Sequence, residues 1–255
     1  DMTEAVSLRQ LGIQRLGVMA ALDQELGDLL THLQDHRIET RARRDYHCGH
    51  IQGQALVAVT ARVGKVAAAS TATTLIERFG CEAVLFVGVA GGLGAGVQVG
   101  DVVVARHLAQ HDLDASPIFP AGEIPLLGLR DIATDVALSQ AVRHAATQAM
   151  VEWSARSDHP HFTRSQLHQG LIVSGDQFIH ANTHAADIVR RWPEALATEM
   201  EGAAVAQVCF EHGVPVAVVR TISDRADDQA TTDFNQFLRE VAAPMSSGLL
   251  RHLLA

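Results

Sequence analysis

The sequence predicts a single-domain α/β protein with a central mixed, twisted β-sheet flanked by helices. Short apolar runs of strand length alternate with segments of helical periodicity along most of the chain. No linker or low-complexity tract interrupts the alternation. The chain has 255 residues, 47% of them hydrophobic, which is enough for one large core. We therefore expect residues 16–255 to form one domain, preceded by an N-terminal extension, residues 1–15, whose order the sequence leaves open.

The strands are predicted from apolar runs bounded by glycine or polar residues. They cover residues 16–21, 46–51, 55–60, 83–89, 101–105, 170–174 and 214–222. The run at 83–89 is apolar almost without interruption, which is typical of a strand buried on both faces. The runs at 46–51 and 55–60 flank Gly53 and predict an antiparallel pair.

The helices are predicted from apolar residues spaced three and four positions apart. They cover residues 22–33, 66–79, 134–155, 183–192, 201–212 and 234–254. The glycine-rich segment 88–96 predicts a loop. Residues 111–127 contain Pro117, Pro120 and Pro125 and predict irregular structure.

Composition excludes several classes of partner. The formal net charge of −9 disfavours nucleic acids and anionic membranes, which require a basic surface. No apolar run reaches the length of a membrane span, and no signal-peptide pattern opens the chain. The cysteines Cys48, Cys81 and Cys209 lie far apart without metal-binding spacing. We therefore expect a cytoplasmic protein without a membrane or nucleic-acid partner.

Acidic residues at the edges of apolar segments are the strongest functional signal. Glu199 and Glu201 lie in the segment 197–202 (ATEMEG), Asp224 follows the run 214–222, and Glu25 follows the run 16–21. Carboxylates beside apolar segments usually have a partner or a chemical role. Each also has a structural alternative: Asp224 as a helix N-cap, and Glu25 and Glu201 as acids in a first helical turn.

Other catalytic and cofactor motifs are missing. The glycines at 88–96 contain no G-x-G-x-x-G fingerprint, so they indicate either a tight turn or close packing of a ligand on bare backbone. No H-E-x-x-H motif occurs, and no G-x-S-x-G elbow occurs. We expect neither a metal nor another cofactor.

Eight short segments, in order, resemble one known family. They are 17–25 (GVMAALDQE), 63–65 (VGK), 90–93 (AGGL), 99–104 (VGDVVV), 111–114 (HDLD), 173–179 (VSGDQFI), 199–201 (EME) and 222–224 (ISD). Together they span the chain from about residue 16 to residue 238. The chain thus resembles the 5′-methylthioadenosine/S-adenosylhomocysteine nucleosidases, within the purine nucleoside phosphorylase superfamily.

This resemblance implies an N-ribosyl hydrolase that releases adenine from 5′-methylthioadenosine, S-adenosylhomocysteine or a related 5′-substituted adenosine. It implies two catalytic residues: Asp224 would protonate the purine at N7, and Glu25 would activate the attacking water. The implied substrate-binding residues are Glu201 and Met200 at the ribose, Phe178 and the backbone of Ile179 at the purine, Phe234 at the 5′ substituent, and Glu199, Ser223, Val63, Ala90 and Gly91. It also implies a homodimer.

The chemistry agrees with these roles. Cleavage of an N-glycosidic bond builds positive charge on the ribose, which nearby carboxylates stabilise. A free aspartic acid has a pKa of about 3.9, so Asp224 requires a raised pKa to act as an acid near neutral pH.

Three alternatives remain open: a hydrolase of another purine nucleoside such as futalosine, a phosphate-dependent phosphorylase, and a nucleoside-binding protein without activity. The segment 87–93 lacks arginine, serine and threonine, and Glu25 would repel phosphate, so water is favoured as the nucleophile. Arg62, Val89 and residues 116–122 depart from the family pattern, and Arg62 and 116–122 leave the 5′ specificity open.

Overall fold

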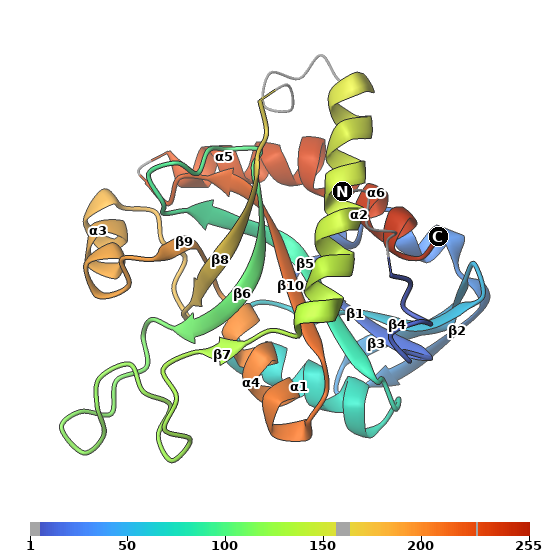
Figure 1. The fold of residues 1–255 in the computed structure, drawn as a ribbon, viewed down its shortest axis with the longest axis horizontal. Coiled ribbons are helices and arrows are strands. Elements are labelled where there is room, and N and C mark those ends of the chain that lie inside the picture. The colour runs from blue at the N-terminus through green and yellow to red at the C-terminus, as the bar shows by residue number, and fades with distance from the viewer. Residues whose placement is uncertain (1–5, 157–163, 228) are drawn as a thin grey trace.

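The computed structural model describes residues 6–156, 164–227 and 229–255, without the side chains of residues 231–233, 235 and 239. Over this part of the chain the predicted single α/β domain is confirmed, because ten strands form one mixed sheet with helices on both faces (Figure 1). The strands are β1 (Arg15–Ala20), β2 (Gln34–Arg41), β3 (Arg44–Ile51), β4 (Gln54–Thr60), β5 (Ala83–Gly92), β6 (Val102–Gln110), β7 (Ile132–Ala133), β8 (Leu167–Ser174), β9 (Ala195–Glu199) and β10 (Val216–Asp224).

The sheet closes on itself around the long strand β5. The strand order is β10-β6-β8-β9-β5-β1-β4-β3-β2, with β7 added to β6. One edge of β5 pairs with β10 along nearly its whole length. The other edge pairs first with β1 and then, at Gly91 and Gly92, with β9. The five strands β10, β6, β8, β9 and β5 therefore form a closed ring, which brings the ends of β5, β9 and β10 together.

Two pairs of helices cover the two faces of the sheet. Helices α1 (Lys65–Glu77) and α4 (Gly202–His212) pack together on one face, and α2 (Val136–Arg156) and α6 (Ala243–Leu253) pack together on the other (Figure 1). Each face buries its own apolar core, because the strands between them present side chains alternately to either side. The short helix α3 (Asn182–Arg191) covers a third, smaller cluster that contains Ile179 and Trp192.

The predicted helix at 22–33 is wrong. This segment forms two short 3-10 helices, η1 (Asp23–Leu26) and η2 (Leu29–His32). They are separated at Gly27, whose φ of 63° is not helical. A Cβ at Gly27 would collide with Ser247 Oγ and would lie 2.6 Å from the carbonyl oxygen of Ala243. Close packing against α6 therefore ends the first helix after one turn.

Other predicted elements differ in extent. Strands β2, β7 and β9 were not predicted: β2 is a polar edge strand, and β7 and β9 have two and five residues. Gly88–Gly92 of the predicted loop belong to β5. The predicted helix at 234–254 consists of α5 (Ala230–Phe237), a π-helical turn (Leu238–Ala242) and α6.

The N-terminal segment contributes to the domain in its described part. Leu8 and Ile13 are buried in the core under α2 and α6, whereas residues 1–5 lie outside the described residues. Within the described part of the chain, no helix has both the length and the hydropathy needed to cross a membrane.

Candidate active site

One pocket, at the ends of β5, β9 and β10 beside η1, collects almost every site residue expected from the sequence. Its walls include both predicted catalytic residues, Asp224 and Glu25. They also include the predicted binding residues Glu201, Met200, Glu199, Phe178, Ser223, Val63, Ala90, Gly91 and Phe234. Ile179 is not among the lining residues: its side chain is buried in the cluster under α3, and its contact with the purine was predicted for the backbone, so that contact stays a prediction. Residues from distant parts of the sequence therefore meet in a single cavity.

Glu25 is held rigidly at the floor of this pocket. Its side chain is buried, and its two oxygens accept hydrogen bonds from the backbone N–H groups of Leu22 (2.8 Å) and Val89 (2.9 Å). Burial raises the pKa of Glu25, against the opposing effects of Arg220 and these N–H groups. A carboxyl with a raised pKa and a fixed position is suited to proton transfer near neutral pH.

Glu199 forms a buried ion pair with Arg220. Arg220 is 1% exposed and donates from its side chain to Glu199 Oε2 at 2.6 and 3.1 Å. The other Glu199 oxygen accepts a short hydrogen bond from Ser174 Oγ, and Gly202 N–H donates to the carboxylate at 2.9 Å. Glu199 is thus satisfied by protein groups, which suggests that it organises the pocket.

Glu201 is buried and lines the same pocket as Glu199. Its Oε2 accepts a hydrogen bond from the Gly64 N–H at 2.9 Å. Burial, and then the negative charge of Glu199, raise the pKa of Glu201 to about 8. The alternative that Glu201 is simply an acid in the first turn of a helix is not supported. Its side chain contacts the backbone just before α1 and makes no capping hydrogen bond to α4.

Asp224 ends β10 and is 1% exposed. Its Oδ1 accepts the Ala226 N–H at 2.8 Å, and its Oδ2 accepts the Ser223 hydroxyl at 2.7 Å. The helix-cap alternative is wrong, because the next helix, α5, begins only at Ala230. Gly91 pairs with Asp224 across the sheet, and a Cβ there would lie 2.9 Å from Oδ1. The bare backbone at Gly91 therefore lets the Asp224 carboxyl and Ala226 pack directly against β5.

Aromatic side chains form the outer wall. The rings of Phe178 and Phe234 meet edge to face with their centroids 5.5 Å apart. Phe178 remains 39% exposed, and Val63 beside the opening is 50% exposed. An exposed aromatic face at a pocket mouth is suited to stacking on a flat heterocycle.

Three polar residues of the site were missed from the sequence: Thr198, which lines the pocket, and Arg220 and Ser174, which hold Glu199. Arg220 lies within the apolar run 214–222, and a charge in the middle of a buried strand was a signal that a partner must exist. Ser174 is the last residue of β8, and Thr198 lies directly before Glu199 in β9. Nothing in their spacing distinguishes them from ordinary strand residues.

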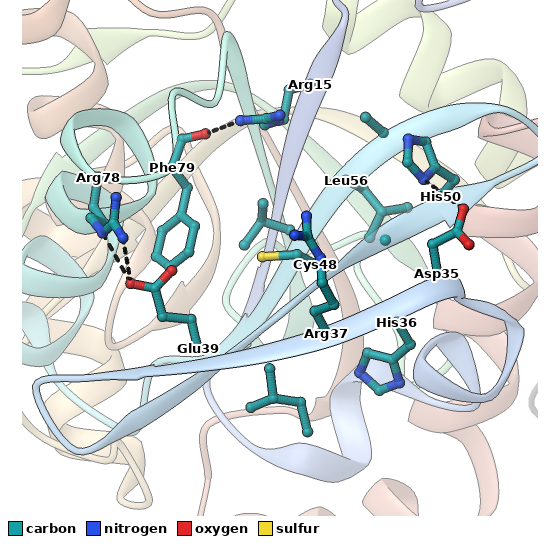
Figure 2. Close-up of a pocket in the computed structure, with 14 residues that line it drawn as sticks. Arg15, Asp35, His36, Arg37, Glu39, Cys48, His50, Leu56, Arg78 and Phe79 are labelled. Carbon is teal, nitrogen blue, oxygen red and sulfur yellow. Dashed lines mark hydrogen bonds and ion pairs between the residues drawn. The ribbon is translucent and has the colours of Figure 1, made fainter.

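A second, larger groove lies away from these acids, on β2, β3 and β4 (Figure 2). Figure 2 shows that its charged side chains largely pair with one another: Arg78 with Glu39 at 2.8 Å, and His50 with Asp35 at 3.8 Å. Its walls share no residue with the pocket of Glu25 and Asp224. The candidate active site is therefore the smaller pocket.

Comparisons with known proteins agree with this assignment. A family model described as the phosphorylase superfamily matches residues 15–255. A 5′-methylthioadenosine/S-adenosylhomocysteine nucleosidase from Marinomonas sp. is 33% identical over 240 residues, which are 94% of this chain and 97% of the relative. The chain belongs to this nucleosidase family. The nucleosidase from Mycobacterium tuberculosis is 32% identical over 246 residues, covering 93% and 96% of the two chains.

Solved structures of the nucleosidase family share the fold. The Neisseria meningitidis nucleosidase in complex with methylthio-immucillin-A has a TM-score of 0.83 at 32% identity, covering 95% of this chain and 99% of the other. The Helicobacter pylori futalosine hydrolase has a TM-score of 0.81, also at 32% identity, covering 96% and 98%. The resemblance seen in the sequence is confirmed, and relatives named for different substrates are similar to this chain to nearly the same degree.

Proposed function

We propose that this protein hydrolyses the N-glycosidic bond of 5′-methylthioadenosine, S-adenosylhomocysteine or a related 5′-substituted adenosine and releases adenine. The observation that carries the proposal is the convergence of Glu25, Glu201 and Asp224 in one buried pocket with an aromatic wall. Such a pocket offers an acid for the leaving base, a base for water and an acceptor for ribose hydroxyls.

The proposed reaction assigns one task to each acid. Asp224, protonated, donates its proton to N7 of the purine, so that adenine departs as a neutral base. Positive charge then develops on the ribose and is stabilised by the surrounding carboxylates. Glu25 accepts a proton from water as the oxygen bonds to the anomeric carbon. Glu201 binds the ribose hydroxyls, Met200 packs on the sugar, and Phe178 stacks on the purine.

Water is favoured over phosphate as the nucleophile. Among the described residues that line the pocket, none is an arginine or a lysine. Arg220 lies behind the pocket and is engaged by Glu199. A phosphate dianion would enter a site rich in carboxyl groups without a free cation to neutralise it.

The decisive test is Asp224→Asn. The variant keeps the shape of the side chain but cannot transfer the proton, so we expect turnover to fall by about a hundredfold or more. Adenine release from 5′-methylthioadenosine is measured with and without phosphate. Asp187→Asn, on the exposed side of α3, is the matched control.

Equal rates for Asp224→Asn and the wild type would remove Asp224 from the proposed role. An absolute requirement for phosphate would instead show a phosphorylase. The same assay with futalosine and with varied 5′ substituents ranks the substrates.

We also propose a homodimer in which the neighbouring subunit covers the open, 5′ end of the pocket. Two observations support it: Val63 and Val66 are 50% and 83% exposed near the mouth, and Ile118, in the loop between β6 and β7, is 83% exposed. That loop extends away from the body of the protein (Figure 1). Light scattering measures the mass in solution, and a monomer would contradict the proposal. The cytoplasmic location expected from the cysteine content stays a prediction.

A further inference from the structure

Thr198 has a buried hydroxyl for which the described residues supply no hydrogen-bond partner. The residue is 5% exposed and lines the pocket of the acids. Its Oγ1 is fully buried and has no hydrogen-bond partner among the described residues. A buried hydroxyl without a partner destabilises a protein, and valine would fill the same space without that cost. Threonine at this position therefore points to a partner that arrives with the ligand.

The sheet register places Thr198 in the same row as Asp224. Thr198 of β9 pairs with Gly91 of β5, and Gly91 pairs on its other edge with Asp224 of β10. Paired residues in a sheet direct their side chains to the same face. A Cβ at Gly91 would meet Asp224 Oδ1 and the Ala226 side chain, which shows that this face is the one that carries the Asp224 carboxyl.

Gly91 stands between Thr198 and Asp224 in this row. Neighbouring strands are about 4.8 Å apart, so two steps separate the backbones of Thr198 and Asp224 by about 10 Å. The Asp224 carboxyl and Ala226 pack directly over Gly91, and both Thr198 and Asp224 line the pocket. A flat bicyclic base bound in that pocket can therefore present one edge to the carboxyl and another to the hydroxyl.

We propose that Thr198 is a base-recognition residue whose hydroxyl forms a hydrogen bond with the six-membered ring of the bound purine. The inference rests on the proposed function, in which Asp224 meets N7 on the five-membered ring. A hydroxyl both donates and accepts, so it matches a ring nitrogen or an exocyclic amino group. The bond satisfies Thr198 only in the complex, and it adds to the selection of the base.

The test compares Thr198→Val with Thr198→Ser. Thr198→Val removes the hydroxyl and keeps the shape, so we expect adenine to bind about tenfold more weakly, as for one lost hydrogen bond in a buried site. Thr198→Ser keeps the hydroxyl, and we expect it to bind adenine within about twofold of the wild type, the scatter of near-neutral changes. Calorimetric titration with free adenine measures the affinity without requiring turnover.

Thermal unfolding without ligand separates recognition from a structural role. Because Thr198 has no partner in the free protein, Thr198→Val should unfold at the same temperature as the wild type or higher. Thr71→Val is the matched control: Thr71 is buried on α1, and its hydroxyl donates to the Ala67 carbonyl at 2.8 Å. We expect that variant to leave adenine affinity unchanged.

Adenine analogues identify the bonded atom. In the series of 1-deazaadenine, 3-deazaadenine and unsubstituted purine, the compound that lacks the partner of Thr198 should bind the wild type and Thr198→Val equally. If all three keep the full difference, or if Thr198→Val binds adenine as the wild type does, the inference is wrong. A lower unfolding temperature for the ligand-free variant would also overturn it, since it would show a structural role.

The two proposals fail in different ways. Adenine binding that depends on Thr198, without adenine release from any nucleoside, would contradict the proposed hydrolase and support the recognition role. Adenine release by the wild type, together with unchanged adenine binding in Thr198→Val, would support the hydrolase and contradict the recognition role.

Discussion

At the scale of single residues, the site depends on the balance between several buried carboxyls and one cation. Arg220 forms an ion pair with Glu199, which also lines the pocket. Neither Glu25 nor Glu201 forms an ion pair with another described residue, and burial raises the pKa of both. Arg220 therefore sets which carboxyl stays paired inside the protein and which carboxyls face the substrate.

Gly88 tests how strictly Glu25 must be placed. A Cβ at Gly88 would collide with Glu25 Oε2 and would lie 3.1 Å from an Arg220 guanidinium nitrogen. We expect Gly88→Ala to displace Glu25 and to lower turnover by about a hundredfold, the loss that a misplacement of about 1 Å can cause. Gly96→Ala is the control, because a Cβ there meets nothing within 4 Å. Comparable rates for both variants would show that the position of Glu25 is not critical.

At the scale of elements, η1 is positioned by its contact with α6 from the end of the chain. The Leu22 and Asp28 backbone N–H groups flank this contact, donating to Glu25 and to Ser247 Oγ respectively. Gly27 permits the close approach, since any side chain there would overlap Ser247 and Ala243. The helix that closes the sequence therefore holds the residue proposed to activate water.

Two glycine variants separate backbone strain from this packing. Gly12 and Gly27 both have positive φ, but a Cβ at Gly12 meets nothing within 4 Å. We expect Gly12→Ala to lower the free energy of unfolding by about 1 kcal/mol through strain alone. Gly27→Ala should lower the free energy of unfolding by about 1–3 kcal/mol more than Gly12→Ala does, which is the usual cost of overpacking. Urea unfolding measures both, and equal losses would contradict the packing argument.

At the scale of the whole molecule, stability should depend on pH through the buried acids. Burial raises the pKa of Glu201 from 4.5 to about 8, so the folded protein keeps a proton that the unfolded chain has already released. The contribution of the Glu201 carboxyl to the free energy of unfolding is complete below about pH 4.5 and is lost as the pH rises toward about 8. Glu25 acts in the same direction, because its pKa is also raised.

Glu201→Gln isolates this contribution. Glutamine cannot ionise, so the variant should gain stability relative to the wild type as the pH rises from about 5 to about 8. We expect a gain of more than about 1.4 kcal/mol, the equivalent of one pKa unit. Glu194→Gln, an exposed change in the loop before β9, is the control. A difference between Glu201→Gln and wild type that does not change with pH would contradict the raised pKa.

Much of the fold was predictable because its strands are buried. β1, β5 and β10 are apolar along most of their length, and that pattern directly reflects burial between two layers of helices. Strand β2 could not be found in this way, since it is a charged edge strand with little apolar surface. The segment 22–33 has a helical pattern, and only its contact with α6 reveals why the helix breaks at Gly27.

The sequence by itself determined the fold class, most of the buried strands and long helices, and the acids Glu25, Glu201 and Asp224, because burial periodicity and acidic residues beside apolar runs are local properties of the chain. The tertiary structure decided which of these residues meet. The pairing of β5 with both β10 and β9 places Asp224, Gly91 and Thr198 in one row, and the Arg220–Glu199 ion pair joins β10 and β9, which do not pair with each other in the sheet. Such contacts follow from the closure of the sheet, which depends on the packing of the whole domain and on no single segment.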